Sequence, residues 1–181
     1  MLSTPEFRAG ARVLARKGLS LDTIVCFPQL PELAAFARAV PDLPIILNHL
    51  GGLNRTGPFA DRDEEVMPAW KSGMAEMAQC PNVMLKLGGM GMPRFGFDWH
   101  TRDTPIGSEE LAPAMAPLLS WCIDRFGPER CMFESNFPVD KVSFSYPVLF
   151  NAFKRLASGA SPSEKADLFA GTASRFYRLG I

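Results

Sequence analysis

Four short apolar runs, alternating with helix-like segments, constrain the fold of this chain more than any other feature. The runs are 21–27 (LDTIVCF), 44–47 (PIIL), 82–87 (NVMLKL) and 130–133 (RCMF). Apolar residues recur at helical spacing in 5–17, 29–40, 64–79, 108–126, 146–156, 161–171 and a short segment from Thr172. Continuous apolar strands that alternate with helices are typical of a parallel sheet covered by helices. The sequence therefore predicts an α/β fold, with its active site in the loops that follow the strands.

Proline and helix-capping residues refine this prediction at two places. Pro117 lies inside the 108–126 segment and predicts a kink or a later helix start, because proline removes a backbone donor. Ser161, Pro162 and Glu164 together predict a capping box at the start of the penultimate helix.

The charge balance excludes several classes of protein. Lys plus Arg total 19 and Asp plus Glu total 19, so the net charge is zero. Nucleic-acid binding and polybasic membrane binding both need a basic surplus, and no apolar run approaches the length of a membrane span. The start of the chain lacks the pattern of a secretory signal. We therefore expect a cytoplasmic protein that binds a small molecule, with no nucleic-acid or membrane partner.

Cysteine and histidine usage bears on metal binding. The four cysteines form no C-x-x-C pair, and the two histidines, His49 and His100, lie 51 positions apart. A catalytic zinc site usually takes three protein ligands, mostly histidines. The residues therefore predict no tightly bound metal or other cofactor.

His49 is the leading candidate for chemistry. It follows the second apolar run and precedes Gly51 and Gly52, which would let a ligand approach the backbone. Its ordinary titration range suits acid–base work or metal ligation. The alternative is a histidine that only hydrogen-bonds to a neighbouring strand.

Two basic residues could bind an anionic substrate. Lys86 points to the opposite face of its strand from Leu85 and Leu87, where a charge needs a carboxylate or an anionic ligand. Its alternative role is a structural ion pair, with Glu134 as a possible partner. Arg94 lies in a loop rich in aromatic residues and could bind a substrate carboxylate.

The segment after the fourth run supplies further polar candidates. Glu134, Ser135 and Asn136 leave the strand end together, and Asp140 and Lys141 follow closely. Carboxylate and amide groups at a strand end can orient water or bind a substrate. The alternatives are a turn stabilised by Ser135 and Asn136 and an exposed Asp–Lys pair.

Several segments, in the right order, resemble the amidohydrolase-related family. This is a TIM-barrel branch of metal-dependent hydrolases that includes dicarboxylate lactonases and aminocarboxymuconate-type decarboxylases. The similar segments are 18–30, 41–51 (PDLPIILNHLG), 82–89, 130–139 (RCMFESNFPV) and 171–179 (GTASRFYRL). They resemble, respectively, strands five to eight and the closing helix of the family.

The resemblance implies the second half of a (β/α)8 barrel, strands five to eight, with residues 1–181 as a single domain that lacks its N-terminal half. A complete barrel takes about 250 residues. His49 would be the strand-six histidine, and Lys86 and Arg94 would be substrate-side residues. Asn136 stands where the family has a strand-eight acid, and an amide is a poor metal ligand and no general base. Full-length relatives could hold a divalent metal such as zinc.

The leading functional hypothesis is a hydrolase that cleaves a C–O or C–N bond of a small carboxylated lactone, ester or amide. His49, Glu134, Asn136 and Asp140 are the candidate catalytic residues. The alternative is a non-catalytic half-barrel or degenerate paralogue that serves as an anion-binding or interaction module. A half-barrel would leave sheet edges unpaired, so we also expect self-association through them.

Overall fold

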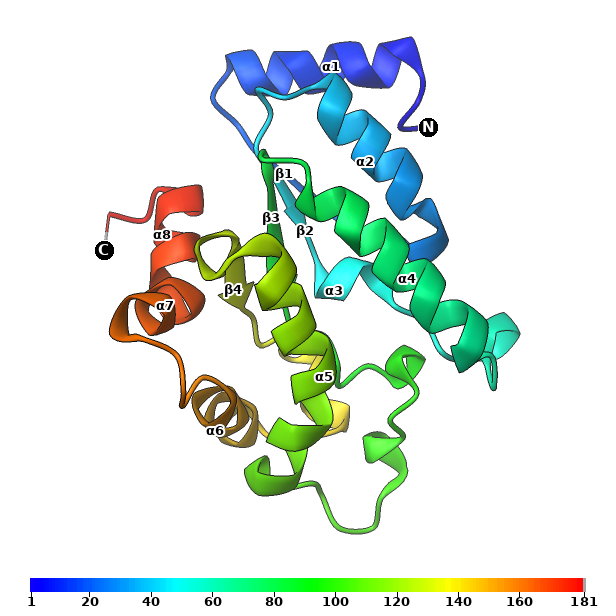
Figure 1. Ribbon diagram of the computed structural model, residues 1–181, viewed down its shortest axis with the longest axis vertical. Helices are drawn as coiled ribbons and strands as arrows, with labels where there is room; N and C mark the ends of the chain where they lie inside the picture. The colour runs from blue at the N-terminus through cyan, green and yellow to red at the C-terminus, as the bar shows by residue number, and fades with distance from the viewer. Residues whose placement is uncertain (181) are drawn as a thin grey trace.

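The protein, described here by a computed structural model over residues 1–180, contains one four-stranded parallel sheet (Figure 1). Its strands lie in chain order: β1 (Leu21–Thr23), β2 (Ile45–Leu47), β3 (Val83–Leu87) and β4 (Cys131–Phe133). In register, Leu21 lies opposite Ile45, and Ile45 lies opposite Val83. The prediction of an α/β fold with parallel strands is confirmed.

Helices precede and follow the strands as the apolar spacing predicts. They are α1 (Pro5–Arg16), α2 (Leu30–Ala39), α4 (Asp63–Ala78), α5 (Ser108–Phe126), α6 (Tyr146–Leu156), α7 (Pro162–Ala166) and α8 (Thr172–Tyr177). The element α3 (His49–Gly52) is a single irregular turn. Short 3-10 turns cover Phe27–Gln29, Gly57–Phe59, Pro93–Phe95, Trp99–Thr101, Pro128–Arg130 and Val139–Val142. None of the helices in residues 1–180 has the length and apolar character needed to cross a membrane.

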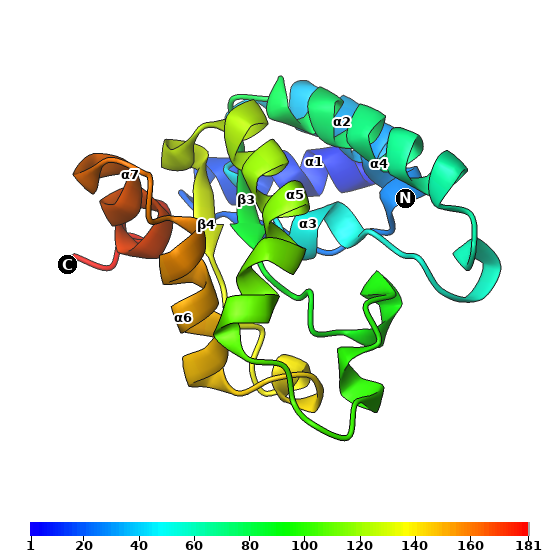
Figure 2. The ribbon, with the colours of Figure 1, turned by 60° about the horizontal axis from the view of Figure 1, so that its bottom comes forward.

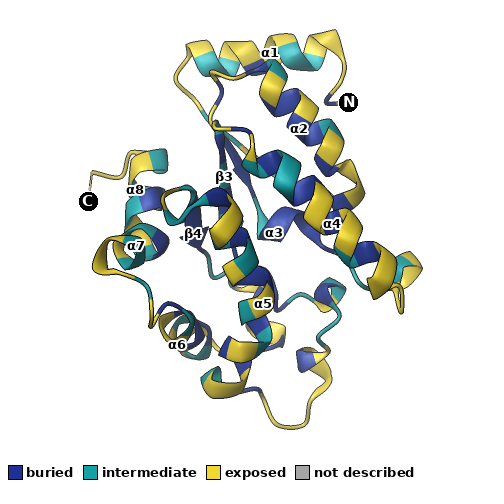
Figure 3. Cartoon of the chain, viewed as in Figure 1, coloured by how far each residue is buried: buried dark blue, intermediate teal, exposed yellow. Residues whose placement is uncertain are grey.

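The helices α2, α4, α5 and α6 follow one another along one face of the sheet (Figure 2). Their apolar stripes form the core together with alternate strand residues. Val83, Leu85 and Leu87 of β3 are buried, whereas Met84 and Lys86 on the opposite face are partly exposed. The buried sides of the helices turn toward the sheet in Figure 3, and their polar sides face solvent. Because of this alternation, one face of the sheet packs against the helices. The opposite face, called the second face below, carries Lys86.

The first strand and the long helix α5 differ from what the sequence predicts. The first strand ends at Thr23 rather than at Phe27, because residues 27–29 form a 3-10 turn around Pro28. The helix α5 runs without a break from Ser108 through Pro113 and Pro117, which corrects the alternative that Pro117 marks its start. Both prolines are exposed, so the carbonyl groups that they leave unpaired face water rather than the core.

The penultimate helix begins with the predicted capping box. The backbone N–H of Glu164 donates to Ser161 Oγ at 3.3 Å, and the N–H of Ser161 donates to Glu164 Oε2 at 2.7 Å. The helix does not continue as one regular element to Gly171, since residues Asp167–Gly171 form a π-helical turn that leads into α8. This C-terminal region packs against β4.

Candidate active site

His49 and Glu134 meet at the carboxyl-terminal ends of β2 and β4. His49 Nδ1 lies 2.5 Å from Glu134 Oε1, and the backbone N–H of His49 donates to the same oxygen at 3.3 Å. The two side chains are 15% and 14% exposed, so they are largely shielded from solvent. The structure thus brings together two candidate residues that lie 85 positions apart in the chain.

The end of β3, between them, is built of glycines for a steric reason. A Cβ on Gly88 would collide with the Glu134 side chain, and a Cβ on Gly89 would lie 2.8 Å from Nδ1 of His49. Gly89 also has φ +77°, a conformation that other residues rarely adopt. The two glycines therefore leave the space that the imidazole and the carboxylate occupy.

The contact with Glu134 fixes the chemistry of the imidazole. A carboxylate can only accept hydrogen bonds, so Nδ1 carries the proton that it donates. In the neutral form of the ring, Nε2 is then the unprotonated nitrogen and can accept a proton from a bound molecule. This is the arrangement of an oriented general base.

Asn136 and Asp140 form a second pair beside the first. Asn136 Nδ2 donates to Asp140 Oδ1 at 2.7 Å, and the backbone N–H of Gly91 donates to Asp140 Oδ2 at 3.1 Å. Burial raises the pKa of the Asp140 carboxyl to about 6, against the opposing effect of these two hydrogen bonds. Asp140 is fully buried and uses both oxygens within the protein, so it ties the loop after β4 to the glycine loop after β3.

Arg94 already makes contacts within the protein. Its Nη2 donates to the carbonyl of Gly52 at 2.9 Å and lies 3.5 Å from Sγ of Cys26, while its buried Nε has no partner among the described residues. Arg94 therefore ties its own loop to the segments that follow β1 and β2.

Lys86 forms its ion pair with Asp22, and not with Glu134 as the sequence suggested. Its Nζ lies 2.9 Å from Oδ2 of Asp22 on β1, and the hydroxyl of Tyr177 donates to the same oxygen at 2.6 Å. Burial lowers the pKa of Lys86, but its hydrogen bonds with Asp22 and Tyr177 prevail and hold that pKa above its usual value. The strand alternation predicted which face Lys86 occupies. It contained no signal for Tyr177, which lies 155 positions from Asp22.

Residues 1–180 do not by themselves bring together three ligands for a metal ion. No group of three His, Cys, Asp or Glu side chains converges anywhere in this part of the chain. At the site itself, Nδ1 of His49 is taken up by Glu134, and both oxygens of Asp140 are taken up by Asn136 and Gly91.

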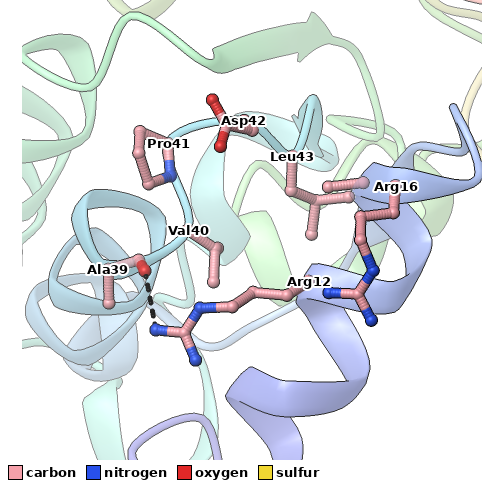
Figure 4. Close-up of a pocket in the computed structure, with 8 residues that line it drawn as sticks. Arg12, Arg16, Ala39, Val40, Pro41, Asp42 and Leu43 are labelled. Atoms are coloured by element: carbon pink, nitrogen blue, oxygen red, sulfur yellow. Dashed lines mark hydrogen bonds between the residues drawn. The ribbon is translucent and has the colours of Figure 1, made fainter.

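A pocket of about 250 Å³ lies elsewhere, between α1 and the segment that leads into β2 (Figure 4). Arg12, Arg16 and Asp42 are among the residues that line it, and Arg12 donates to the carbonyl of Ala39 at 3.4 Å. The pocket sits at the amino-terminal end of β2, whereas His49 follows the carboxyl-terminal end. It is therefore separate from the candidate site.

Known proteins resemble this chain over nearly its whole length. It is 39% identical to the uncharacterized protein y4mH of Sinorhizobium fredii over 97% of this chain and 52% of that protein. It is 30% identical to an L-fucono-1,5-lactonase of Burkholderia multivorans over 96% of this chain and 56% of that enzyme. A zinc-bound crystal structure of an amidohydrolase from Burkholderia multivorans superposes with a TM-score of 0.82 at 28% identity, covering 98% of this chain and 58% of that chain.

The chain thus spans about half the length of the curated relatives that it matches. The family model described as amidohydrolase matches residues 2–179, essentially the whole of the chain. With the parallel sheet and the polar residues at its carboxyl-terminal edge, this match shows that the chain belongs to the amidohydrolase family.

Proposed function

We propose that this chain forms strands five to eight of a (β/α)8 barrel and carries catalytic groups of a hydrolase that opens small lactones. Three observations support the proposal. The family model covers residues 2–179, relatives about 30% identical are named as sugar-acid lactonases, and the polar candidates lie where active sites form in such folds. The contact between His49 and Glu134 is the observation that carries it.

In the proposed reaction, Nε2 of His49 takes a proton from water as the water oxygen attacks the lactone carbonyl carbon. Glu134 keeps the imidazole in the required tautomer and stabilises the imidazolium that forms. The ring C–O bond then breaks, and His49 returns its proton to the departing alkoxide. Water and lactone thus become a hydroxy acid, and the enzyme returns to its starting state.

The neighbouring pair assists this reaction in the proposal. Asp140 holds Nδ2 of Asn136, and Oδ1 of the same amide is the acceptor that would receive a hydrogen from the attacking water. Arg94 would attract the carboxylate of the substrate or product through Nη1.

The basic side chains lend little support to the alternative of an anion-binding module. Lys86 is paired with Asp22, and Arg94 donates to a backbone carbonyl. The charge of Lys86, proposed from the sequence as a substrate residue, is already balanced by Asp22. The hydrolase therefore remains the better supported function.

The test is hydrolysis of 1,5- and 1,4-aldonolactones by the natural protein that carries this chain, followed by acid release at constant pH. We expect His49→Gln and Glu134→Gln each to lower kcat on the order of 100-fold or more, as loss of an oriented base does. His100→Gln is the matched control, because His100 is exposed in the Trp99–Thr101 turn. Wild-type activity in folded His49→Gln protein would contradict the proposal.

A further inference from the structure

The turn that carries His49 has an unusual backbone. After β2, four consecutive residues have positive φ: His49 (+51°), Leu50 (+51°), Gly51 (+64°) and Gly52 (+68°). The left-handed region is unfavourable for side-chain-bearing residues, and such a conformation persists only where the surroundings determine it. Something outside the turn must therefore hold His49 and Leu50 in place.

Trp70 of α4 supplies that hold. Its indole Nε1–H donates to the carbonyl of Leu50 at 2.8 Å, and both residues are fully buried. The turn is also pressed closely between two elements. A Cβ on Gly51 would lie 2.5 Å from Sδ of Met74 on α4, and a Cβ on Gly52 would collide with the carbonyl of Val25. The indole bond is the one polar contact that α4 makes to the turn among the described hydrogen bonds.

The same turn fixes how His49 meets Glu134. Both the backbone N–H and Nδ1 of His49 lie against Oε1 of Glu134, at 3.3 Å and 2.5 Å. A rotation of the peptide unit at Leu50 would move the backbone of His49 and shift both contacts. The orientation of the imidazole therefore depends on a helix residue that touches neither His49 nor the open site in the described contacts.

We propose that Trp70 is a positioning residue: its indole N–H holds the left-handed turn so that His49 stays hydrogen-bonded to Glu134. This inference rests on the proposed function for its effect on catalysis, and on geometry alone for its effect on the imidazole.

Two variants of the natural protein separate the hydrogen bond from ring volume. Trp70→Phe removes the donor and part of the ring. Benzothienylalanine, introduced at position 70 by nonsense suppression, keeps the bicyclic shape and replaces N–H with sulfur. Trp121→Phe is the matched control, because Trp121 packs against Trp70 at 5.4 Å between ring centroids and leaves the bond to Leu50 intact. We expect both variants at position 70 to lower kcat on the order of 10-fold or more with KM unchanged within twofold, and Trp121→Phe to do neither.

The second readout is independent of activity. The ¹⁵N shifts of the imidazole report which ring nitrogen carries the proton, and the signal of His49 is the one lost in His49→Gln. We expect Nδ1–H in the wild type and a mixture of tautomers in both variants at position 70. Wild-type shifts in the benzothienylalanine protein would overturn the positioning role. Altered shifts there, combined with full activity in His49→Gln, would instead overturn the proposed function and leave the positioning role standing.

Discussion

Asp140 shows how a single side chain can hold two loops together at an energetic cost. Its carboxyl group is fully buried, and hydrogen bonds from Asn136 and Gly91 only partly replace its lost hydration. Burial therefore raises its pKa from the usual 3.8 to about 6. In the folded protein this group binds a proton that the unfolded chain has already released between roughly pH 4 and pH 6.

This difference predicts that Asp140 makes the protein less stable as the pH rises through about 6. The contribution of Asp140 to stability is complete at pH values below its pKa in the unfolded chain. It is lost at pH values above its pKa in the folded protein, and the total loss is on the order of 3 kcal/mol. Urea unfolding between pH 4 and pH 7.5 measures it as the difference in slope between the wild type and Asp140→Asn, which cannot titrate. Parallel stability curves for the two proteins would show that Asp140 has an ordinary pKa.

At the scale of elements, Asn82 joins α2 to the sheet. Its Nδ2 lies within 3.2 Å of the carbonyl oxygens of Ala37, Val40 and Leu43, at the end of α2 and in the connection to β2. The carbonyl of Ala37 also accepts from the backbone N–H of Val40 at 3.3 Å, and that of Val40 from the N–H of Leu43 at 3.0 Å, so the amide adds a second donor where α2 ends. One side chain just before β3 thus caps α2 and fixes where β2 begins.

We expect Asn82→Ala to lower the free energy of unfolding by about 2 kcal/mol, since it removes the partly buried hydrogen bonds from one amide to these carbonyl groups. Chemical denaturation measures the loss. Asn151→Ala on the exposed side of α6 is the matched control and should change stability by less than about 0.5 kcal/mol. An equal effect at both positions would mean that the amide of Asn82 contributes nothing specific.

At the scale of the whole molecule, the sheet has two edge strands, β1 and β4. Among residues 1–180, β1 and β4 each pair with a strand on one side alone, and Ile24 just beyond β1 is 61% exposed. Tyr177 of α8 reaches Asp22 and Lys86, so the C-terminal region approaches β1 on this second face of the sheet. An unpaired strand edge with an exposed apolar side chain favours pairing with another chain.

We therefore predict that the 181-residue chain self-associates through the free edge of β1. Light scattering during size exclusion should give a mass that rises above 19.9 kDa with concentration. Ile24→Lys should increase the monomer fraction, because a charge at an edge opposes strand pairing. Val13→Lys, at an exposed position on α1, should not. A monomer of the wild type at every concentration would contradict the prediction.

The sequence by itself determined the parts of this protein that depend on near neighbours. The alternation of apolar strands and helices, the side of β3 that carries Lys86 and the capping box at Ser161 all follow from periods and spacings within one element. The placement of His49 and Glu134 directly after strands also predicted that they lie at one edge of the sheet. These inferences hold because backbone geometry fixes the direction of a side chain within its own strand or helix.

Only the tertiary structure decided which distant groups meet. Lys86 pairs with Asp22 and not with Glu134, Tyr177 joins them from the C-terminal helix, and Trp70 reaches the turn that carries His49. A sequence pattern assigns a side chain to a face, but strand register and helix packing choose its partner across that face. The contact of 2.5 Å between His49 and Glu134 depends in addition on the left-handed turn after β2 and the glycines after β3, whose conformations long-range packing enforces.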